Sequence, residues 1–243
     1  MLSEVPIRSR ALDRFEPIIG AQKVDQIRNA ARALKARLGG RAIWTLNTTA
    51  AGGGVAEMLH PLLGYCHGLG VDIRWLVVGG RGDFFRITKR LHNALHGSTG
   101  DGSALGDAER PAYEEILDEN AAELLGRVRP GDLVILHDPQ TAGLIPHLDR
   151  AGAVTVWRCH IGGDLAQEEV RRGWRFLEPY LDPAHAFVFS RREYVPPFCD
   201  PARTAIIHPS IDPFSVKNQE LDDDVVRAIL VEAALVAGPN GHA

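Results

Sequence analysis

Short apolar runs alternate along this chain with longer stretches of helical periodicity, and this alternation constrains the fold more than any other feature. The expected strands cover residues 41–47, 71–78, 132–137, 153–159, 184–190 and 204–208. The expected helices cover residues 20–38, 55–69, 83–96, 108–127, 141–150, 168–181 and 221–236. Strands that alternate with helices at this spacing build parallel sheets with helices on both faces. The sequence therefore predicts an α/β fold with a doubly wound, mostly parallel sheet.

Size, charge and cysteine content narrow the class of protein. A chain of 243 residues can bury a substantial core in one large domain or two small ones. Its 27 Lys and Arg against 31 Asp and Glu give a net charge of −4, which argues against binding nucleic acid or anionic membranes through bulk charge. Three widely spaced cysteines argue against a disulfide scaffold or a structural zinc site. Because no signal-like segment and no run of about 18 apolar residues occurs, we expect a cytoplasmic protein.

Three consecutive glycines, Gly52, Gly53 and Gly54, lie between the first expected strand and the helix that follows it. Glycines there let the backbone approach a ligand closely, and the start of the next helix offers free N–H groups to an anion. The spacing matches neither G-x-G-x-x-G nor G-x-x-x-x-G-K-[ST], so it does not indicate a dinucleotide site or a P-loop. A tight turn without a ligand explains the triplet equally well, and Glu57 then only complements the helix dipole.

Polar side chains also follow two later strands. His137 and Asp138 follow the third expected strand, and the segment from Arg158 to Asp164, which includes His160, follows the fourth. Ligands of open α/β sheets bind beyond the carboxyl ends of the strands, the same edge at which the glycines lie. Each group alone has a simpler explanation, because a strand-end Asp often caps a helix and a His is often a satisfied buried group. Together they favour a crevice that recognises hydroxyls and anions.

Several catalytic signatures do not occur in the sequence. It has no G-x-S-x-G or H-E-x-x-H motif, and no cluster has the spacing of metal ligands. His92 and His96 are four residues apart on an expected helix, but no third ligand accompanies them, so a partly exposed helix face is the better interpretation. A hydrolase with its own nucleophile is therefore disfavoured, and no metal site is expected.

Five segments carry a resemblance to a known family: NTTAAGGGVAE (47–57), FFxxTKxxHNAL (84–95), HDPQ (137–140), RCHI (158–161) and PSIDPxSxKN (209–218). Together they resemble the trehalose-forming glucosyltransferases (glycosyltransferring trehalose synthase) and the related trehalose phosphorylases. The resemblance runs from FEPI (15–18) to the final helix. It implies the N-terminal, Rossmann-like half of the retaining, two-domain GT-B fold of glycosyltransferase family 4.

The resemblance also implies how the chain is divided. We expect an N-terminal lead and helix over residues 1–40 and a Rossmann-like, acceptor-side domain of GT-B type over residues 41–220. Residues 221–243 are expected to form a hinge helix and the truncated start of the donor domain.

On the donor side, the resemblance assigns Gly52, Gly53 and Gly54 to the loop that approaches the phosphate and sugar of the donor. Arg158 is expected to support this donor pocket or to meet anionic charge. His160 is expected to contact the donor glucose near the reacting carbon, which makes it a catalytic candidate.

On the acceptor side, the resemblance assigns Asp138 to the hydroxyls of the acceptor glucose, as a second catalytic candidate. The family usually has an Asp directly after the His-Ile pair, whereas here Gly162 and Gly163 intervene before Asp164. Asp164 is therefore the remaining acceptor-binding candidate, in a pocket that departs from the family pattern.

The implied function is the acceptor-side module of a retaining glycosyltransferase that moves glucose from a nucleotide-glucose to glucose. The expected partners are nucleotide-glucose and glucose or trehalose, with either a separate C-terminal donor domain or a second copy of this chain. No nucleic-acid or membrane partner is expected, and no cofactor either, because the nucleotide-sugar is a substrate. Two alternatives stay open: a non-catalytic sugar-binding remnant or subunit that needs a partner, and a trehalose phosphorylase.

Overall fold

The computed structural model of the chain describes residues 2–237 and divides into two compact units, Met1–Pro209 and Ser210–Ala243. The strands are β1 (Leu2–Val5), β2 (Ile43–Asn47), β3 (Ile73–Val78), β4 (Leu133–His137), β5 (Val154–Cys159), β6 (Ala186–Phe189) and β7 (Thr204–Ile206). The helices of the first unit are α1 (Glu16–Ile19), α2 (Ala21–Leu38), α3 (Gly54–Gly68), α4 (Gly82–Leu95), α5 (Arg110–Leu124), α6 (Ile145–Arg150) and α7 (Glu168–Leu181). The second unit contains α8 (Asp223–Glu232).

The predicted sheet is confirmed. Within residues 2–237, seven strands form one sheet in the order β1-β3-β2-β4-β5-β6-β7. Every neighbouring pair is parallel except β1 with β3. From β2 the chain moves outward to β3 and then returns past β2 to β4, so the direction of winding reverses between β2 and β4. In doubly wound sheets, ligands bind at the carboxyl ends of the strands beside such a reversal.

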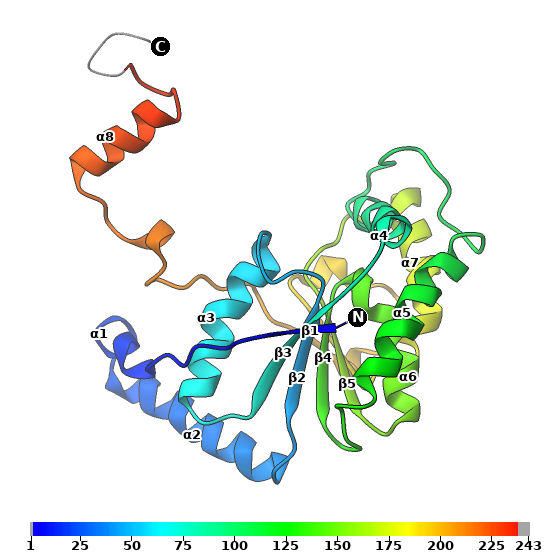
Figure 1. The fold of residues 1–243 in the computed structure, drawn as a ribbon, viewed down its shortest axis with the longest axis horizontal. Coiled ribbons are helices and arrows are strands. Elements are labelled where there is room, and N and C mark those ends of the chain that lie inside the picture. The colour runs from blue at the N-terminus through cyan, green and yellow to red at the C-terminus, as the bar shows by residue number, and fades with distance from the viewer. Residues whose placement is uncertain (1, 238–243) are drawn as a thin grey trace. The chain divides into compact units, whose positions relative to one another are not determined.

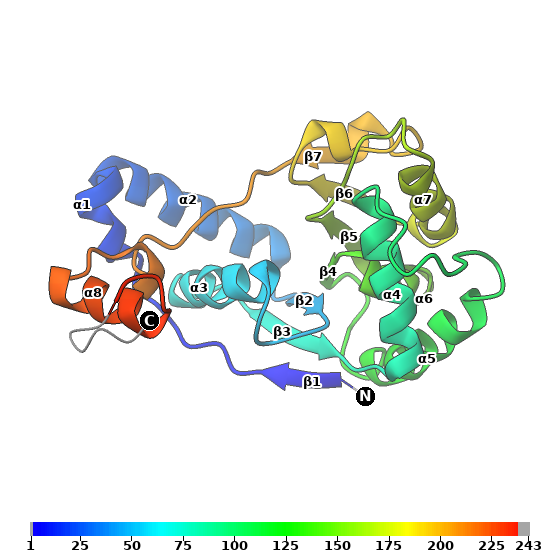
Figure 2. The ribbon, with the colours of Figure 1, turned by 90° about the horizontal axis from the view of Figure 1, so that it is seen from above.

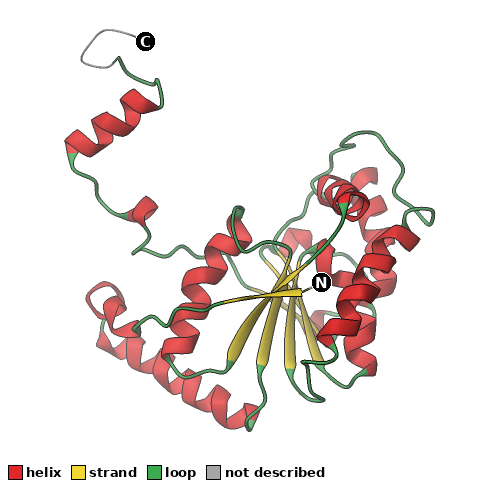
Figure 3. Ribbon diagram, viewed as in Figure 1, coloured by secondary structure: helices red, strands yellow, loops and turns green. Residues whose placement is uncertain are grey.

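Helices cover both faces of the sheet, with α2 and α3 on one face and α4 to α7 on the other (Figures 1 and 2). Figure 3 shows the strands between the two groups of helices. The buried apolar side chains form two hydrophobic cores, a larger and a smaller one. Strand β4 contributes side chains to both, because side chains alternate between the two faces of a strand. Val134 and Leu136 join the larger core with α4 to α7, while Leu133 and Ile135 pack against the smaller core with α3. None of the helices in the described part of the chain is both long and apolar enough to span a membrane.

The helix expected over residues 20–38 is confirmed as α2. It ends at Gly39, which adopts the left-handed conformation (φ 57°) that favours glycine, and the N–H of Gly39 donates to the carbonyl of Lys35. The expected apolar face is buried only in part, since Val24 is fully buried whereas Ile27 and Leu34 are 39% and 38% exposed.

Two features differ from the sequence-based expectations. Strand β1 lies in the segment expected to be a polar lead; Leu2 pairs antiparallel with Val78, and this long-range pairing has no local signature. The helix expected over residues 141–150 begins as the 3-10 helix Pro139–Leu144 and becomes α-helical only in α6. Residues 238–243, the last part of the expected third segment, lie outside the described residues.

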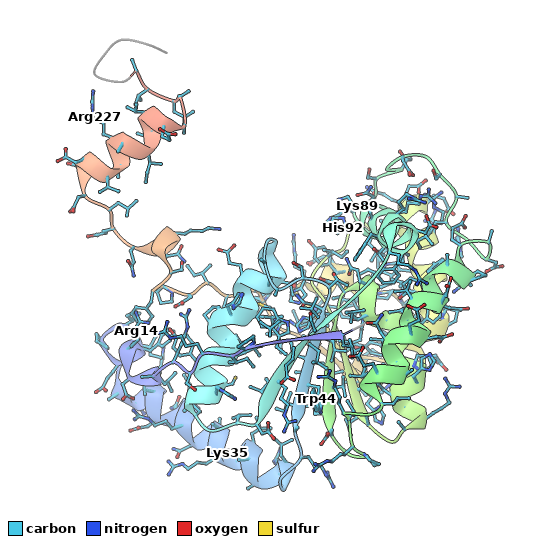
Figure 4. All side chains as sticks on the ribbon, viewed as in Figure 1. Arg14, Lys35, Trp44, Lys89, His92 and Arg227 are labelled. Atoms are coloured by element: carbon cyan, nitrogen blue, oxygen red, sulfur yellow. The ribbon has the colours of Figure 1, made fainter. Side chains whose placement is uncertain are left out.

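At the amino end of β4, the buried carboxylate of Asp132 holds the start of β2 against the turn that precedes β4. It accepts hydrogen bonds from the backbone N–H groups of Ala42 and Arg129 and from Nε1 of Trp44, each at 3.0 Å. Trp44 is labelled in Figure 4. Burial opposes the charge of this carboxylate, but the three donors hold its pKa below the usual value. Asp132 is therefore a structural carboxylate whose hydrogen bonds are supplied by the protein.

Candidate functional site

The carboxyl ends of β4 and β5 bring four of the polar residues together. His137 lies opposite Arg158 in the parallel register of these strands. The N–H of the next residue, Asp138, donates to the carbonyl of Arg158 at 2.9 Å, and His160 follows one residue beyond β5. We call His137, Asp138, Arg158 and His160 the strand-end cluster. It contains both catalytic candidates and lies beside the strand at which the winding of the sheet reverses.

Asp138 has a backbone conformation that is rare for a residue other than glycine, with φ 62° and ψ 177°. Such conformations cost roughly 1–3 kcal/mol and concentrate at functional sites. Its carbonyl accepts hydrogen bonds from Nε1 of Trp157 (3.1 Å) and Oγ1 of Thr141 (3.2 Å), which hold the main chain in place. As a result, Oδ1 of Asp138 turns toward the neighbouring segment and accepts the N–H of His160 at 2.8 Å.

The capping explanation for Asp138 is wrong. Asp138 precedes the 3-10 helix that begins at Pro139, but its side chain makes no capping hydrogen bond there. Instead, burial raises the pKa of Asp138 to about 7, although the N–H of His160 and the positive charge of Arg158 favour the ionised form. The second carboxylate oxygen has no hydrogen bond to any residue that the structure describes. This oxygen is available to a hydroxyl group of a ligand.

The two histidines of the cluster contact each other directly. Nδ1 of His137 lies 2.9 Å from Nε2 of His160, and the rings are nearly parallel, with an interplanar angle of 14° and centroids 5.2 Å apart. Burial and the charge of Arg158 lower the pKa of His160 to about 4. Burial, together with His160 and Arg158, also lowers the pKa of His137 well below its usual value. Both imidazoles are therefore neutral at pH 7.

Arg158 is half-buried and forms no ion pair within 4 Å with any residue that the structure describes. Its Nη2 lies 3.8 Å from Sδ of Met58 on α3, and its Nε is buried with no partner among the described residues. Burial lowers the pKa of the guanidinium, partly opposed by the nearby Asp138. A partly desolvated cation with no ion pair is costly for a protein to maintain. An anion that binds beside Arg158 would supply the missing charge partner and stabilise the guanidinium.

The glycine loop, residues 52–54, follows β2 and leads into α3. Gly52 and Gly53 have positive φ values of 75° and 81°, and a Cβ on any of the three glycines would have no heavy atom within 4 Å. The backbone conformation therefore favours glycine at positions 52 and 53, and the space beside the loop is open. The segment before it is tied down by Nδ2 of Asn47, which donates to the carbonyl of Thr49 at 2.7 Å. Arg158 contacts Met58, so α3 links this loop to the strand-end cluster.

Asp164 is exposed in the segment before α7, where its Oδ1 accepts the N–H of Ala166 at 2.9 Å, and it has no hydrogen bond to the strand-end cluster within residues 2–237. The two glycines before it have a packing reason. A Cβ on Gly162 would lie 2.3 Å from Cγ of Tyr194, and one on Gly163 would lie 2.9 Å from the carbonyl oxygen of Leu95. Close approach of these neighbours thus explains why small residues separate His160 from Asp164.

Two residues of this arrangement had no assigned role at the level of sequence: His137 and Met58. The His-Asp pair after β4 marked His137, but its partner His160 is on another strand and becomes visible only through the register. No group of three or more His, Cys, Asp or Glu side chains within residues 2–237 is arranged to hold a metal ion.

The fold is of the Rossmann-like type found in the N-terminal half of GT-B proteins, and solved structures share it. A solved E. coli structure, described as trehalose-6-phosphate bound with UDP-2-fluoro glucose, matches 77% of this chain and 53% of that chain with a TM-score of 0.56 at 13% identity. A trehalose-6-phosphate synthase structure gives a TM-score of 0.57 over 77% and 54% of the two chains, also at 13% identity. The sequence family described as "Trehalose synthase, N-terminal domain" matches residues 45–196, and the chain belongs to this family.

Curated relatives agree with this assignment. Trehalose synthase from Pyrococcus horikoshii is 36% identical over 221 residues, which cover 91% of this chain and 50% of the relative. The enzyme of that name from Rubrobacter xylanophilus is 34% identical over 92% of this chain and 52% of its own length. Trehalose phosphorylase from Pleurotus pulmonarius is 29% identical over 87% of this chain and 30% of its own length. The chain thus spans about half the length of the trehalose synthases it matches.

Proposed function

We propose that this chain forms the acceptor-side half of a retaining glucosyltransferase that transfers glucose from a nucleotide-glucose to glucose, and so makes trehalose. The observation that supports this most is the half-buried guanidinium of Arg158, which forms no ion pair with the described residues and lies beside the strained Asp138 at the reversal of the sheet. The guanidinium of Arg158 can bind a phosphate, and the free oxygen of Asp138 can accept a hydrogen bond from a sugar hydroxyl. The pair therefore suits a site that binds a phosphate and a sugar together.

In this proposal, Asp138 binds the acceptor glucose. Its free oxygen accepts a hydrogen bond from a sugar hydroxyl, while Oδ1 stays bonded to the N–H of His160. Because the carboxylate is poorly solvated, that hydrogen bond forms with little competition from water. The same bond to His160 fixes the acceptor relative to the second catalytic candidate.

The donor would lie between Arg158 and the glycine loop. Arg158 would meet the negative charge of the diphosphate, and the open backbone of Gly52, Gly53 and Gly54 would let the donor approach closely. His160 would contact the donor glucose near the reacting carbon. Catalysis would then rest on positioning and on stabilising an oxocarbenium-like centre beside the leaving diphosphate, with no cofactor and no protein nucleophile.

We further propose that most contacts to the nucleotide-sugar come from a second Rossmann-like domain, because the chain spans about half the length of its trehalose synthase relatives. The same half-site suits a trehalose phosphorylase, in which inorganic phosphate is the anion at Arg158; the Pleurotus relatives support this second candidate.

Calorimetric titration of the 243-residue chain with glucose tests the acceptor site. Asp138→Ala should weaken glucose binding roughly 10- to 100-fold, because a hydrogen bond to a charged group contributes roughly 1.5–3 kcal/mol. Melting curves should stay near those of the unchanged chain. A large loss of melting temperature at intact glucose affinity would instead mean that Asp138 is a purely structural residue.

Activity measurements distinguish trehalose synthesis, phosphorolysis of trehalose and sugar binding without catalysis. The chain would be incubated with ADP-, UDP- or GDP-glucose plus glucose, and separately with trehalose plus phosphate, each with and without the C-terminal half of a related trehalose synthase. Trehalose formed only in the presence of both halves supports the proposal. Phosphate-dependent loss of trehalose supports the phosphorylase, and a reconstituted pair that binds glucose but converts nothing supports a non-catalytic sugar-binding subunit.

A further inference from the structure

The contact between His137 and His160 has two chemically distinct forms. Because both imidazoles are neutral at pH 7, the 2.9 Å contact between Nδ1 of His137 and Nε2 of His160 contains a single hydrogen. Either His137 donates and His160 accepts, or the reverse. The two forms leave His160 with its remaining ring hydrogen on different atoms, so they present different chemistry to a ligand.

We propose that His137 is a positioning residue that donates its Nδ1–H to Nε2 of His160 and thereby fixes His160 in the Nδ1–H tautomer. The geometry of the pair carries this assignment, and only its consequence for sugar binding rests on the function proposed above.

The direction of the hydrogen bond follows from the other nitrogen of His137. Only 2% of His137 is exposed, and its Nε2 is buried without a hydrogen-bond partner among the described residues. If His160 donated, this Nε2 would carry a hydrogen and become a buried N–H without an acceptor. Among buried groups, orphaned N–H donors are rarer than under-satisfied acceptors. The arrangement with His137 as donor leaves only a bare nitrogen lone pair at that position.

Both residues are anchored by their main chains as well as by their rings. The carbonyl of His137 accepts a hydrogen bond from Oγ1 of Thr141 at 2.9 Å, and the N–H of His160 donates to Asp138. The nearly parallel rings leave little freedom for one imidazole to turn against the other. The tautomer is therefore set by fixed elements at the ends of β4 and β5.

This assignment narrows what His160 can do. Its Nε2 is occupied as an acceptor, and its Nδ1–H has no hydrogen bond to the part of the chain that the structure describes. His160 then acts toward a ligand as a hydrogen-bond donor to an oxygen atom. It does not act as a base, since its basic nitrogen is already engaged by His137.

Nitrogen-15 NMR of the 243-residue chain at pH 7 tests the assignment directly, through the two- and three-bond couplings that identify the protonated ring nitrogen. We expect His160 and His137 each to be protonated at Nδ1. His185 provides an internal reference of the opposite kind, because its Nδ1 accepts the N–H of Thr155 at 3.3 Å and its hydrogen must lie on Nε2. A His160 protonated at Nε2, or exchanging between both tautomers, would overturn the proposal.

Two variants separate positioning from simple space-filling. His137→Phe removes the donor but keeps a ring, so His160 should lose its fixed Nδ1–H form. His137→Asn retains an N–H donor near the place of Nδ1 and should preserve it. If His137→Phe leaves the tautomer of His160 unchanged, His137 does not set it. Should either variant fail to fold, the spectrum of the unchanged chain still decides the question.

The NMR result is independent of whether the chain binds sugar. A His160 fixed at Nδ1–H in a chain that does not bind glucose would contradict the proposed function and leave the tautomer assignment intact. Glucose binding with His160 protonated at Nε2 would contradict the tautomer assignment and leave the proposed function intact.

Discussion

Two aspartates flank strand β4, and the protein treats them in opposite ways. Asp132, before the strand, is 3% exposed and accepts three N–H hydrogen bonds at 3.0 Å, which hold its pKa below the usual value. Asp138, after the strand, is half-buried, has a positive φ and accepts one N–H, and its pKa is raised to about 7. The two residues flank the same strand and have the same side chain.

The difference shows which end of the sheet is built for stability and which for binding. At the amino end, the protein itself supplies every partner that the carboxylate of Asp132 needs. At the carboxyl end, the backbone is strained, and within residues 2–237 one oxygen of Asp138 has no hydrogen bond and Arg158 forms no ion pair. Groups left unsatisfied in this way raise the free energy of the folded protein, and such costs are typical of sites where a ligand supplies the missing partner.

The largest expected effect is a pH dependence of opposite sign at the two aspartates. Between about pH 4 and 7, the folded protein holds a proton on Asp138 that the unfolded chain has released, so this group lowers stability as the pH rises. The variant Asp138→Asn has no ionisable group at this position and does not lose stability in this way. The free energy of unfolding of the variant, relative to that of the unchanged chain, should therefore rise by on the order of 4 kcal/mol from pH 4 to pH 8. Urea unfolding at pH 4, 6 and 8 measures the difference.

Asp132→Asn is the matched control. The pKa of Asp132 is depressed, so its charge stabilises the folded protein at neutral pH, and that contribution disappears only as the pH falls below the usual range of a carboxyl group. This variant should be less stable by roughly 1–3 kcal/mol at pH 7, with a deficit that shrinks in acid. Parallel pH profiles for the two variants would contradict the comparison.

The next effect concerns the unpaired cation. Arg158→Met should weaken binding of ADP-glucose or pyrophosphate roughly 10- to 100-fold, because charge-assisted hydrogen bonds contribute roughly 1.5–3 kcal/mol. The free energy of unfolding should stay the same or rise, since a desolvated charge without a partner is removed. Titration calorimetry and urea unfolding measure the two quantities.

Arg37→Met, at an exposed position near the end of α2, is the control for Arg158 and should change neither quantity. If Arg158→Met destabilises the chain as much as it weakens anion binding, the guanidinium has a structural partner and the carboxyl end is not specialised for ligands.

The glycine loop offers a third test with its own control. Gly53→Ala places a side chain at φ 81°, and we expect a stability loss of about 1–2 kcal/mol from backbone strain. Gly54→Ala lies in equally open space at the start of α3 without a positive φ, and should be neutral or stabilising by up to about 1 kcal/mol. Thermal unfolding of both variants measures these changes in stability. Equal effects would mean that the loop relaxes freely and is not held ready for a ligand.

The smallest effect is expected at Asp164. Asp164→Ala removes one exposed hydrogen bond to Ala166, so stability should fall by no more than about 1 kcal/mol. Glucose affinity should change far less than it does for Asp138→Ala, as measured by the same calorimetric titration. A loss comparable to that of Asp138→Ala would place Asp164 in the acceptor pocket despite its exposed position.

Much of the fold could be predicted from local pattern. Helix α7 begins and ends at the residues expected, Glu168 and Leu181, because its amphipathic period and its neighbours are encoded within one stretch of chain. The end of β4 at His137 was also expected, since an apolar run gives way there to polar residues. Strand β1 was not expected, because four residues with one buried leucine form a strand only when β3 lies beside them.

The sequence by itself determined that a glycine loop follows β2 and that polar residues follow β4 and β5, all at one edge of a parallel sheet. It did not determine that His137 contacts His160, that Asp138 adopts a positive φ in place of a helix cap, or that Asp164 lies outside the cluster. Those outcomes depend on contacts near 3 Å between segments that are distant in the sequence, and on how much water each group loses. Register and burial set both quantities, and both are properties of the folded chain, so only the tertiary structure could decide them.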